Sequence, residues 1–241
     1  MGMRISPSEF VVPLFGLTKK EDKWIFLGTG FFFGKPPYLA TADHVLGDMY
    51  RKIGVHIIEK QEFYSASFVA RKSDVDLAIL KIEKYAPPFS CRLAKDEDIS
   101  FTQAIYSYEY GTTQPLGEAT ILSPATRMGN VTRTRNLQDI YGEAGDTMLE
   151  LSFPALRGAS GAPVVRIDDE VILWGIIVAN ASYHLLPAQV EKVVEGDSTV
   201  EEIKYLLPQA LAVNVKHLSK FLEEMNHNES VHRIADKAGS R

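Results

Sequence analysis

The chain has 241 residues, 45% of them hydrophobic and 24% charged, which is ordinary for a soluble globular domain with a sizeable core. Its formal net charge of −5, without a dense Lys/Arg run, argues against a nucleic-acid partner, because such binding needs a concentrated basic face. The longest apolar stretch, Val171–Val178, is too short to cross a membrane as a helix and predicts a buried strand instead.

Short β-branched and aromatic runs, separated by Gly, Pro, Asn and Asp, predict an all-β fold. The strands predicted in the first half are Phe10–Leu17, Trp24–Phe33, Tyr38–Ala42, Val55–Ile58, Phe63–Arg71 and Leu77–Ile82. Those in the second half are Ala104–Tyr110, Ala119–Ser123, Asn130–Thr134, Met148–Phe153, Ala162–Arg166, Val171–Val178 and Ala210–Val213. Pro87, Pro88 and the polar stretch to Ser100 predict a linker between the halves.

A helix is predicted over about residues 214–226, with Asn214 as its N-cap. Its apolar positions recur at helical spacing: Val215, Leu218, Phe221, Leu222 and Met225. Residues 227–241 are polar and aperiodic, which predicts a disordered tail. The segment Leu185–Leu207 is longer than a simple hairpin needs, so we expect an extended β-hairpin or a lid.

A histidine, an acid and a serine each lie in a short segment that suits acyl transfer. The segments are Ala40–Val45 (ATADHV), Asp74–Leu80 (DVDLAIL) and Gly158–Pro163 (GASGAP), in that order. The order His, Asp, Ser is that of chymotrypsin and differs from the orders in subtilisin and the α/β-hydrolases. Order alone is weak evidence, because any long chain contains these residue types, so the flanking residues carry the argument.

The serine segment resembles the Gly-x-Ser-Gly-Gly-Pro turn of the trypsin-like serine proteases. Its small residues let the backbone fold tightly, so that the amides of Gly158 and Ser160 converge on one point. The segment before His44 resembles the family's Leu-Thr-Ala-x-His-Val, and Asp76 with the next four residues resembles Asp-Leu-Ala-Leu-Leu. Gly28–Phe31 (GTGF) matches the Gly-Ser/Thr-Gly-Phe strand of the family.

The resemblance covers about Phe10–Met225 and is closest to the disulfide-free, HtrA-like bacterial branch, here expected without a PDZ domain. It implies a single trypsin-like peptidase domain over 8–226, built of two six-stranded antiparallel β-barrels with a C-terminal α-helix. The first barrel is expected over about 8–97 and the second over about 100–213. It also implies a serine endopeptidase that cleaves peptide bonds through an acyl-enzyme intermediate.

The same resemblance gives the site residues their roles. His44 takes the proton of Ser160 as attack begins, and Asp76 holds the imidazole in the required tautomer. The amides of Gly158 and Ser160 form the oxyanion hole. Asp74 competes for the acid's role because residues two apart in a strand face the same way, and only the match to the family's Asp-Leu-Ala register favours Asp76.

Asp43, next to His44, is expected to point away from the imidazole.

Two positions differ from the residues found in digestive trypsins. Ala159 stands where those enzymes have an Asp that pairs with a freed N-terminus, which excludes that ion pair here. Pro154, six residues before Ser160, replaces the residue at the base of the specificity pocket. With no carboxylate there, we expect a small or medium apolar residue on the acyl side of the cut.

The expected partner is a protein or peptide substrate, docked as an added strand beside the short segment Val178, Ala179 and Asn180. Whether an activating partner or an oligomer is needed remains open.

No cofactor and no metal are predicted, because the remaining histidines (His56, His184, His217, His227 and His232) lack zinc-ligand spacing. Cys91, the only cysteine, is predicted to be a small core residue. It can form no internal disulfide, whereas secreted trypsins carry several, so a cytoplasmic location is predicted.

Two other functions compete with a serine endopeptidase. One is a catalytically silent trypsin-like fold that acts as a peptide-binding or scaffold module. The complete set of three segments argues against it, because degenerate members lose one of the three residues. The other is an esterase or acyltransferase with the same triad, which the chymotrypsin order and the two-barrel pattern make the weaker interpretation.

Overall fold

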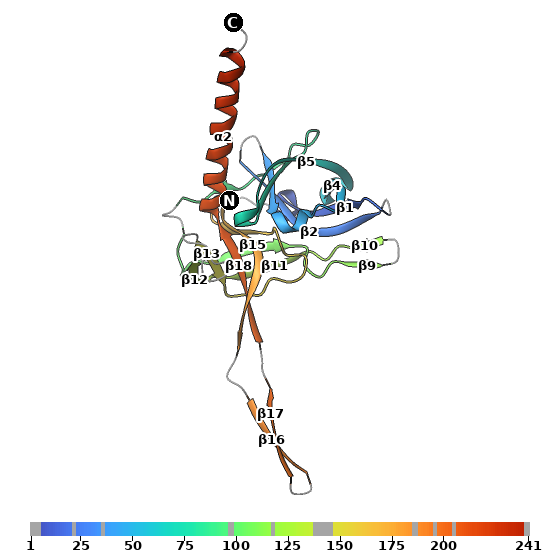
Figure 1. The fold of residues 1–241 in the computed structure, drawn as a ribbon, viewed down its shortest axis with the longest axis vertical. Helices are drawn as coiled ribbons and strands as arrows, with labels where there is room; N and C mark the ends of the chain where they lie inside the picture. The colour runs from blue at the N-terminus through green and yellow to red at the C-terminus, as the bar shows by residue number, and fades with distance from the viewer. Residues whose placement is uncertain are drawn as a thin grey trace.

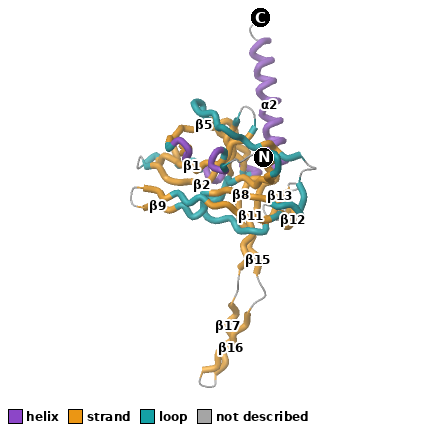
Figure 2. Tube along the Cα trace, turned by 180° about the vertical axis from the view of Figure 1, so that it is seen from behind, coloured by secondary structure: helices purple, strands orange, loops and turns teal. Residues whose placement is uncertain are grey.

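The computed structural model describes residues 6–20, 23–34, 37–95, 99–116, 119–136, 147–184, 188–194, 197–203 and 206–238. Two β-rich halves pack together in the middle of the molecule, and a long helix and a long hairpin extend from them at opposite ends (Figure 1). The same arrangement seen from behind shows that strands make up most of both halves (Figure 2).

The first half is a closed six-stranded barrel with the strand order β1-β2-β3-β6-β5-β4. Its strands are β1 (Val11–Thr18), β2 (Trp24–Phe33), β3 (Tyr38–Ala42), β4 (Tyr50–Ile57), β5 (Glu62–Lys72) and β6 (Leu77–Lys81). Short 3-10 turns join or precede them: η1 (Pro7–Glu9), η2 (Asp43–Leu46), η3 (Ile58–Lys60) and η4 (Ser73–Val75). Phe31, Leu39 and Ile79 of these strands are fully buried, so folding removes their apolar surface from water.

The second half is an eight-stranded sheet with the path β11-β8-β14-β15-β18-β13-β12, to which β7 adds by pairing with β15. The strands are β7 (Arg92–Leu93), β8 (Ile105–Glu109), β11 (Ala125–Gly129), β12 (Val131–Asn136), β13 (Thr147–Leu151), β14 (Pro163–Ile167), β15 (Val171–His184) and β18 (Leu206–Asn214). The two ends of the path, β11 and β12, are separated in the chain by Asn130 alone. Counted as one bent strand, they complete a ring of six, which is the expected second barrel.

Two hairpins extend from the second half. One is formed by β9 (Gln114–Leu116) and β10 (Ala119–Ile121). The other continues β15 and β18 outward through β16 (Ala188–Val194) and β17 (Asp197–Ile203), which pair in register from Ala188↔Ile203 to Val194↔Asp197. Of the two expectations for Leu185–Leu207, the extended hairpin is therefore confirmed over its described residues.

The C-terminal helix corrects the predicted boundary. Helix α2 runs over Val215–Ala238, so it continues past the expected end at about residue 226, into the segment 227–241 predicted as a disordered tail. Residues 239–241 lie outside the described residues. No Pro or Gly interrupts the chain between 227 and 238, and the next residue is Gly239, the type preferred just after a helix end. The predicted N-cap is confirmed, since Asn214 Oδ1 accepts a hydrogen bond from the Lys216 N–H at 3.0 Å.

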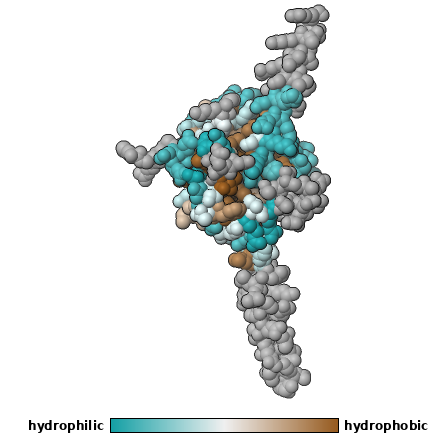
Figure 3. Space-filling model, turned by 90° about the vertical axis from the view of Figure 1, so that its left-hand side faces the viewer, coloured by the Kyte–Doolittle hydropathy of each residue, from teal (hydrophilic) through white to brown (hydrophobic). Residues whose placement is uncertain are grey.

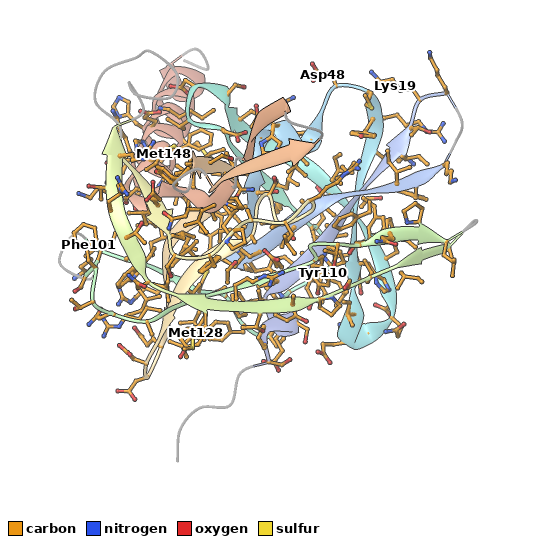
Figure 4. The ribbon with its side chains drawn as sticks, turned by 90° about the horizontal axis from the view of Figure 1, so that it is seen from below. Lys19, Asp48, Phe101, Tyr110, Met128 and Met148 are labelled. Carbon is orange, nitrogen blue, oxygen red and sulfur yellow. The ribbon has the colours of Figure 1, made fainter. Side chains whose placement is uncertain are left out.

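Hydrogen bonds join the two halves around Thr29 of β2. The Thr29 N–H donates to the Ser160 carbonyl at 3.0 Å, and the Thr29 hydroxyl donates to the Gly158 carbonyl at 2.8 Å. Tyr110, which lies inside the molecule in Figure 4, is fully buried and donates its O–H to the Val11 carbonyl at 3.2 Å. These contacts hold the Ser160 turn of the second half against the first barrel.

Hydrophilic side chains cover most of the described surface on the face shown in Figure 3, around a smaller apolar area. Across the described part of the chain, no helix has both the length and the apolar character needed to cross a membrane.

Candidate active site

The pairing of β3 with β6 brings His44 and Asp76 together. These strands are antiparallel with Ala42 opposite Leu77, so the residues just after Ala42 and just before Leu77 meet at the same end of the barrel. His44 lies in η2, directly after β3, and Asp76 directly precedes β6. The pairing of these two strands thus places His44 and Asp76 side by side, although they are 32 residues apart in the sequence.

Asp76 holds His44 at two points. Its Oδ2 lies 2.7 Å from the imidazole Nδ1, and its Oδ1 accepts a hydrogen bond from the His44 backbone N–H at 2.8 Å. A carboxylate on Nδ1 leaves Nε2 as the nitrogen that faces a reactant, which is the tautomer that general-base catalysis requires. The His44 side chain is 49% exposed and that of Asp76 22% exposed, so the imidazole is open to solvent and substrate.

The surroundings favour the protonated form of His44. Its pKa is raised above the ordinary 6.5, chiefly by the hydrogen bond to Asp76, and further by the negative charges of Asp76 and Asp43. Partial burial acts in the opposite direction but does not cancel these effects. An imidazole in this setting is a stronger base than a free histidine, and its cation is stabilised when it accepts a proton.

The two other acids near His44 have different positions. Asp74 is exposed in η4, and among the contacts of the described residues it makes no hydrogen bond to His44. Asp43 points away from the imidazole, toward Arg71 and Ser73. The sequence analysis missed this network of Asp43, because its members lie 28 and 30 residues apart and no local motif marks them.

Ser160 lies in a tight turn that depends on two glycines. Gly158 and Gly161 have φ values of +99° and +85°, a region that side chains with a Cβ avoid. A Cβ built on Gly161 would lie 2.1 Å from both the Thr29 carbonyl oxygen and the Thr41 hydroxyl. The turn therefore packs directly against strands β2 and β3 of the first barrel, and Ser160 remains partly exposed.

The same packing brings Ser160 beside the histidine segment. A Cβ built on Gly28 would lie 2.9 Å from the Ser160 carbonyl oxygen and 3.1 Å from Cγ1 of Val45, the residue after His44. On the other side, a Cβ on Gly161 would lie 3.1 Å from the Ala42 nitrogen, two residues before His44. Gly28 thus lies between the serine turn and Val45, and Gly161 lies close to the chain that leads into His44.

The peptide between Arg157 and Gly158 is oriented by its neighbours. The Arg157 carbonyl accepts a hydrogen bond from the Thr112 N–H at 3.0 Å. In a planar trans peptide the N–H points opposite to the carbonyl, so the Gly158 N–H points away from Thr112. Within the described residues, neither this N–H nor that of Ser160 donates a backbone hydrogen bond, so both remain available to an oxyanion.

The geometry agrees with a family assignment from the sequence. Residues 28–172, more than half of the chain, match the trypsin-like peptidase domain family. The chain belongs to the trypsin-like peptidases. A search of curated proteins finds no match.

Solved structures show the same fold at low sequence identity. The HtrA-type protease AlgW with a decapeptide aligns with a TM-score of 0.62 and 17% identity over 91% of this chain and 65% of that one. The active form of the Rv3671c protease from M. tuberculosis aligns with a TM-score of 0.61 and 17% identity over 90% of this chain and 81% of that one. This trypsin-like peptidase thus spans just under two thirds of the AlgW chain.

One edge of β15 lies next to the serine turn. On one side this strand pairs with β14 up to Ile176, and Ile177 then exchanges backbone hydrogen bonds with Gly161 and Ala162 of the serine turn. Beyond Ile177 the described pairing is with β18 alone. The register with β18 shifts between Ile177 and Ala179, which places Val178 at a bulge. The predicted substrate segment Val178, Ala179 and Asn180 therefore has an edge without a strand partner among the described residues.

Pro154 and Asn180, both predicted to contact substrate, lie on segments that the structure links directly. The Asn180 Oδ1 accepts a hydrogen bond from the Ala155 N–H at 2.8 Å, and its Nδ2 donates to the Ala155 carbonyl at 2.7 Å. The Asn180 side-chain amide therefore connects β15 to the residue that follows Pro154. This double contact was not predicted, because the sequence shows only that the two residues are 25 apart.

Neither a metal centre nor a reactive thiol is found in the described part of the chain. No group of three or more His, Cys, Asp or Glu side chains there is arranged to hold a metal ion. Cys91 is 1% exposed, and burial strongly raises the pKa of its thiol, so the reactive thiolate is disfavoured. Ser160, by contrast, is partly exposed.

Proposed function

We propose that this trypsin-like peptidase is a serine endopeptidase with His44, Asp76 and Ser160 as its triad. One observation supports the proposal above the others. The Asp76 carboxylate holds the Nδ1 side of the His44 imidazole at 2.7 Å, next to a glycine-supported turn that presents Ser160. A histidine with a fixed tautomer beside a serine is the arrangement that activates a hydroxyl at neutral pH.

In the first step of the proposed mechanism, the Ser160 Oγ attacks the carbonyl carbon of the scissile peptide while its proton passes to Nε2 of His44. Asp76 stabilises the resulting imidazolium. The negative charge that develops on the carbonyl oxygen is met by the N–H groups of Gly158 and Ser160. Collapse of this intermediate breaks the C–N bond, and the proton on His44 goes to the leaving amine.

In the second step, water replaces the amine. His44 takes a proton from the water, the hydroxide attacks the acyl-enzyme ester, and the same two amides bind the second oxyanion. Breakdown releases the carboxylic acid and returns the proton to Ser160. No cofactor is needed, because the nucleophile, the base and the oxyanion donors all belong to this chain.

We propose that the substrate is a protein or peptide that binds as a strand on the edge of β15 at Val178–Asn180. Main-chain hydrogen bonds then supply affinity whatever the sequence, and side-chain pockets supply selectivity. Pro154 offers no charge to a substrate side chain, so the expected residue on the acyl side of the cut is small or medium-sized and apolar.

The test is a kinetic comparison of three forms of the full chain on an unstructured protein substrate and on peptide libraries. Ser160→Ala is expected to lower kcat by about 10⁶-fold, because the nucleophile is lost. Ser182→Ala, an exposed serine on β15, is the matched control and should keep full activity. Residual peptidase activity in Ser160→Ala close to that of the control would rule out this mechanism.

A further inference from the structure

Asp43 is a buried acid whose side chain has two partners away from the imidazole. Its side chain is 8% exposed. Its Oδ1 accepts a hydrogen bond from the Arg71 Nε at 2.5 Å, and its Oδ2 accepts one from the Ser73 hydroxyl at 2.7 Å. Both carboxylate oxygens are thus engaged, as expected of a charge that is held away from water.

These partners belong to the segment that carries the catalytic acid. Arg71 lies near the end of β5, Ser73 begins η4, and η4 leads directly to Asp76. The backbone contributes as well, because the Asp43 N–H donates to the Asp76 carbonyl at 3.1 Å. The residue before His44 is therefore tied at three points to residues 71–76.

Asp76 itself has a backbone conformation that needs support. Its φ of 54° and ψ of 45° lie in the left-handed region, which a residue other than glycine rarely adopts. Such a conformation persists only where surrounding contacts impose it. Among the described residues, the contacts from outside this turn come from Asp43 and His44, whose backbone N–H groups donate to Asp76. The Asp76 N–H itself donates only to the carbonyl of Ser73, within the same turn.

We propose that Asp43, Arg71 and Ser73 form a positioning clamp that sets the separation of His44 and Asp76. The inference rests on the proposed function of these two residues. The three clamp residues touch neither substrate nor the reacting atoms, and they act by fixing η2 against η4. The three sequence segments that carry the proposed triad do not by themselves predict these clamp contacts.

The clamp also sets the charge beside the histidine. Among the described residues, the acids that raise the pKa of His44 are Asp76 and Asp43, and Arg71 lies directly on the second of these. Arg71 also contacts a second acid, since its Nη1 lies 3.1 Å from Oδ1 of Asp48, whose side chain is 94% exposed. The Asp48 carbonyl accepts a hydrogen bond from Lys19, and both residues lie at the rim of the barrel (Figure 4). Removing Asp43 therefore takes a negative charge away from the surroundings of His44, whereas removing Arg71 takes a positive charge away.

Two kinds of effect are expected. Arg71→Gln and Ser73→Ala should lower kcat/KM by about 10- to 100-fold, because small displacements of catalytic groups are costly. Arg71→Lys should recover part of the loss, since an ammonium restores one donor to Asp43. Asp43→Asn should lower the pKa of His44, whereas Arg71→Gln, which leaves Asp43 without its cation, should raise it.

The experiment is proton NMR of the full chain, which follows the titration of His44 and the resonance of its Nδ1 proton shared with Asp76. The variants are Asp43→Asn, Arg71→Gln and Ser73→Ala, with thermal unfolding used to confirm that each is folded. Arg92→Gln is the control, because Arg92 makes a similar ion pair with Glu170 at the far end of β15. Ser73→Ala keeps the test valid if a charge variant does not fold.

Opposite shifts of the His44 titration in Asp43→Asn and Arg71→Gln, with a weakened Nδ1 proton signal in the clamp variants, would support the clamp. Spectra indistinguishable from those of Arg92→Gln would overturn it. The readout does not require turnover, so it is separate from the test of the proposed function. A wild-type chain without peptidase activity that still shows the opposite shifts would support the clamp and contradict the endopeptidase.

Discussion

The two halves of the molecule contribute to the site by different physical means. The first barrel supplies His44 and Asp76, which are held by side-chain hydrogen bonds and by charges that include the buried carboxylate of Asp43. The second supplies Ser160 and two amides, which are held by positive-φ glycines and backbone hydrogen bonds. We call His44 with Asp76 one half-site, and Ser160 with its two amides the other. The first is therefore expected to be sensitive to charge and pH, and the second to added side-chain volume.

This difference predicts which substitutions each half-site tolerates. In the first barrel an isosteric change that removes a charge is expected to be damaging, although it leaves the packing intact. At the Ser160 turn a single added methyl group is expected to be damaging, although it leaves every charge intact.

Asp76→Asn should lower kcat by about 10⁴-fold while the fold is retained, because an amide no longer fixes the required tautomer of His44. Asp74→Asn is the matched control two residues away, and it should be close to wild type because Asp74 is exposed. Steady-state kinetics on a peptide substrate measure both. Similar losses in the two variants would mean that Asp76 has no special role.

Gly158→Ala should lower kcat by about 10²- to 10³-fold, because the strained and crowded alanine displaces the backbone N–H that serves as one oxyanion donor. An added Cβ there would lie 2.8 Å from Phe26 Cε1 and 3.0 Å from the Tyr110 carbonyl oxygen, at a φ of +99°. The left-handed strain costs about 1–3 kcal/mol, so Tm is measured alongside kcat. Gly30→Ala is the comparison, because its φ is ordinary and its closest contacts are 3.2 Å, and it should lose much less activity. Equal activity of the two variants would contradict the oxyanion assignment.

The pH profile of kcat/KM should fall on the acid side as His44 becomes protonated, because only the neutral imidazole accepts the serine proton. The pKa of His44 is raised, chiefly by Asp76, so the midpoint is expected above 6.5. Asp76→Asn should move the midpoint to lower pH. A wild-type midpoint at or below 6.5 would show that Asp76 does not act on His44 in solution.

Much of the architecture could be predicted because local patterns mark it. Strands Trp24–Phe33 and Tyr38–Ala42 have the predicted limits, since dense aromatic or β-branched runs end there at turn residues. Strand β4 begins at Tyr50 rather than Val55, because its first residues are polar and join the sheet by pairing with β1. Strand β11 was missed for the same reason, as its residues Ala125–Gly129 are partly or fully exposed.

The site shows the same division between local and long-range information. His44, Asp76 and Ser160 stand in short segments with recognisable neighbours, so the sequence was sufficient to propose them. The attachment of Asp43 to Arg71 and the double hydrogen bond between Asn180 and Ala155 join residues 25 or more positions apart. Such pairs follow from strand register and turn geometry, and a single sequence carries no sign of them.

The central claim is that the two half-sites meet in a working triad with Ser160 as nucleophile. The most direct measurement is labelling of the purified chain with a fluorophosphonate probe, with Ser160→Ala alongside and the modified residue located by mass spectrometry. A phosphonyl adduct on Ser160 that is absent from the variant is the predicted result, because only an activated serine beside an oxyanion hole reacts readily. A wild-type chain that is folded but remains unlabelled would contradict the account and favour a trypsin-like fold that binds peptides without cleaving them.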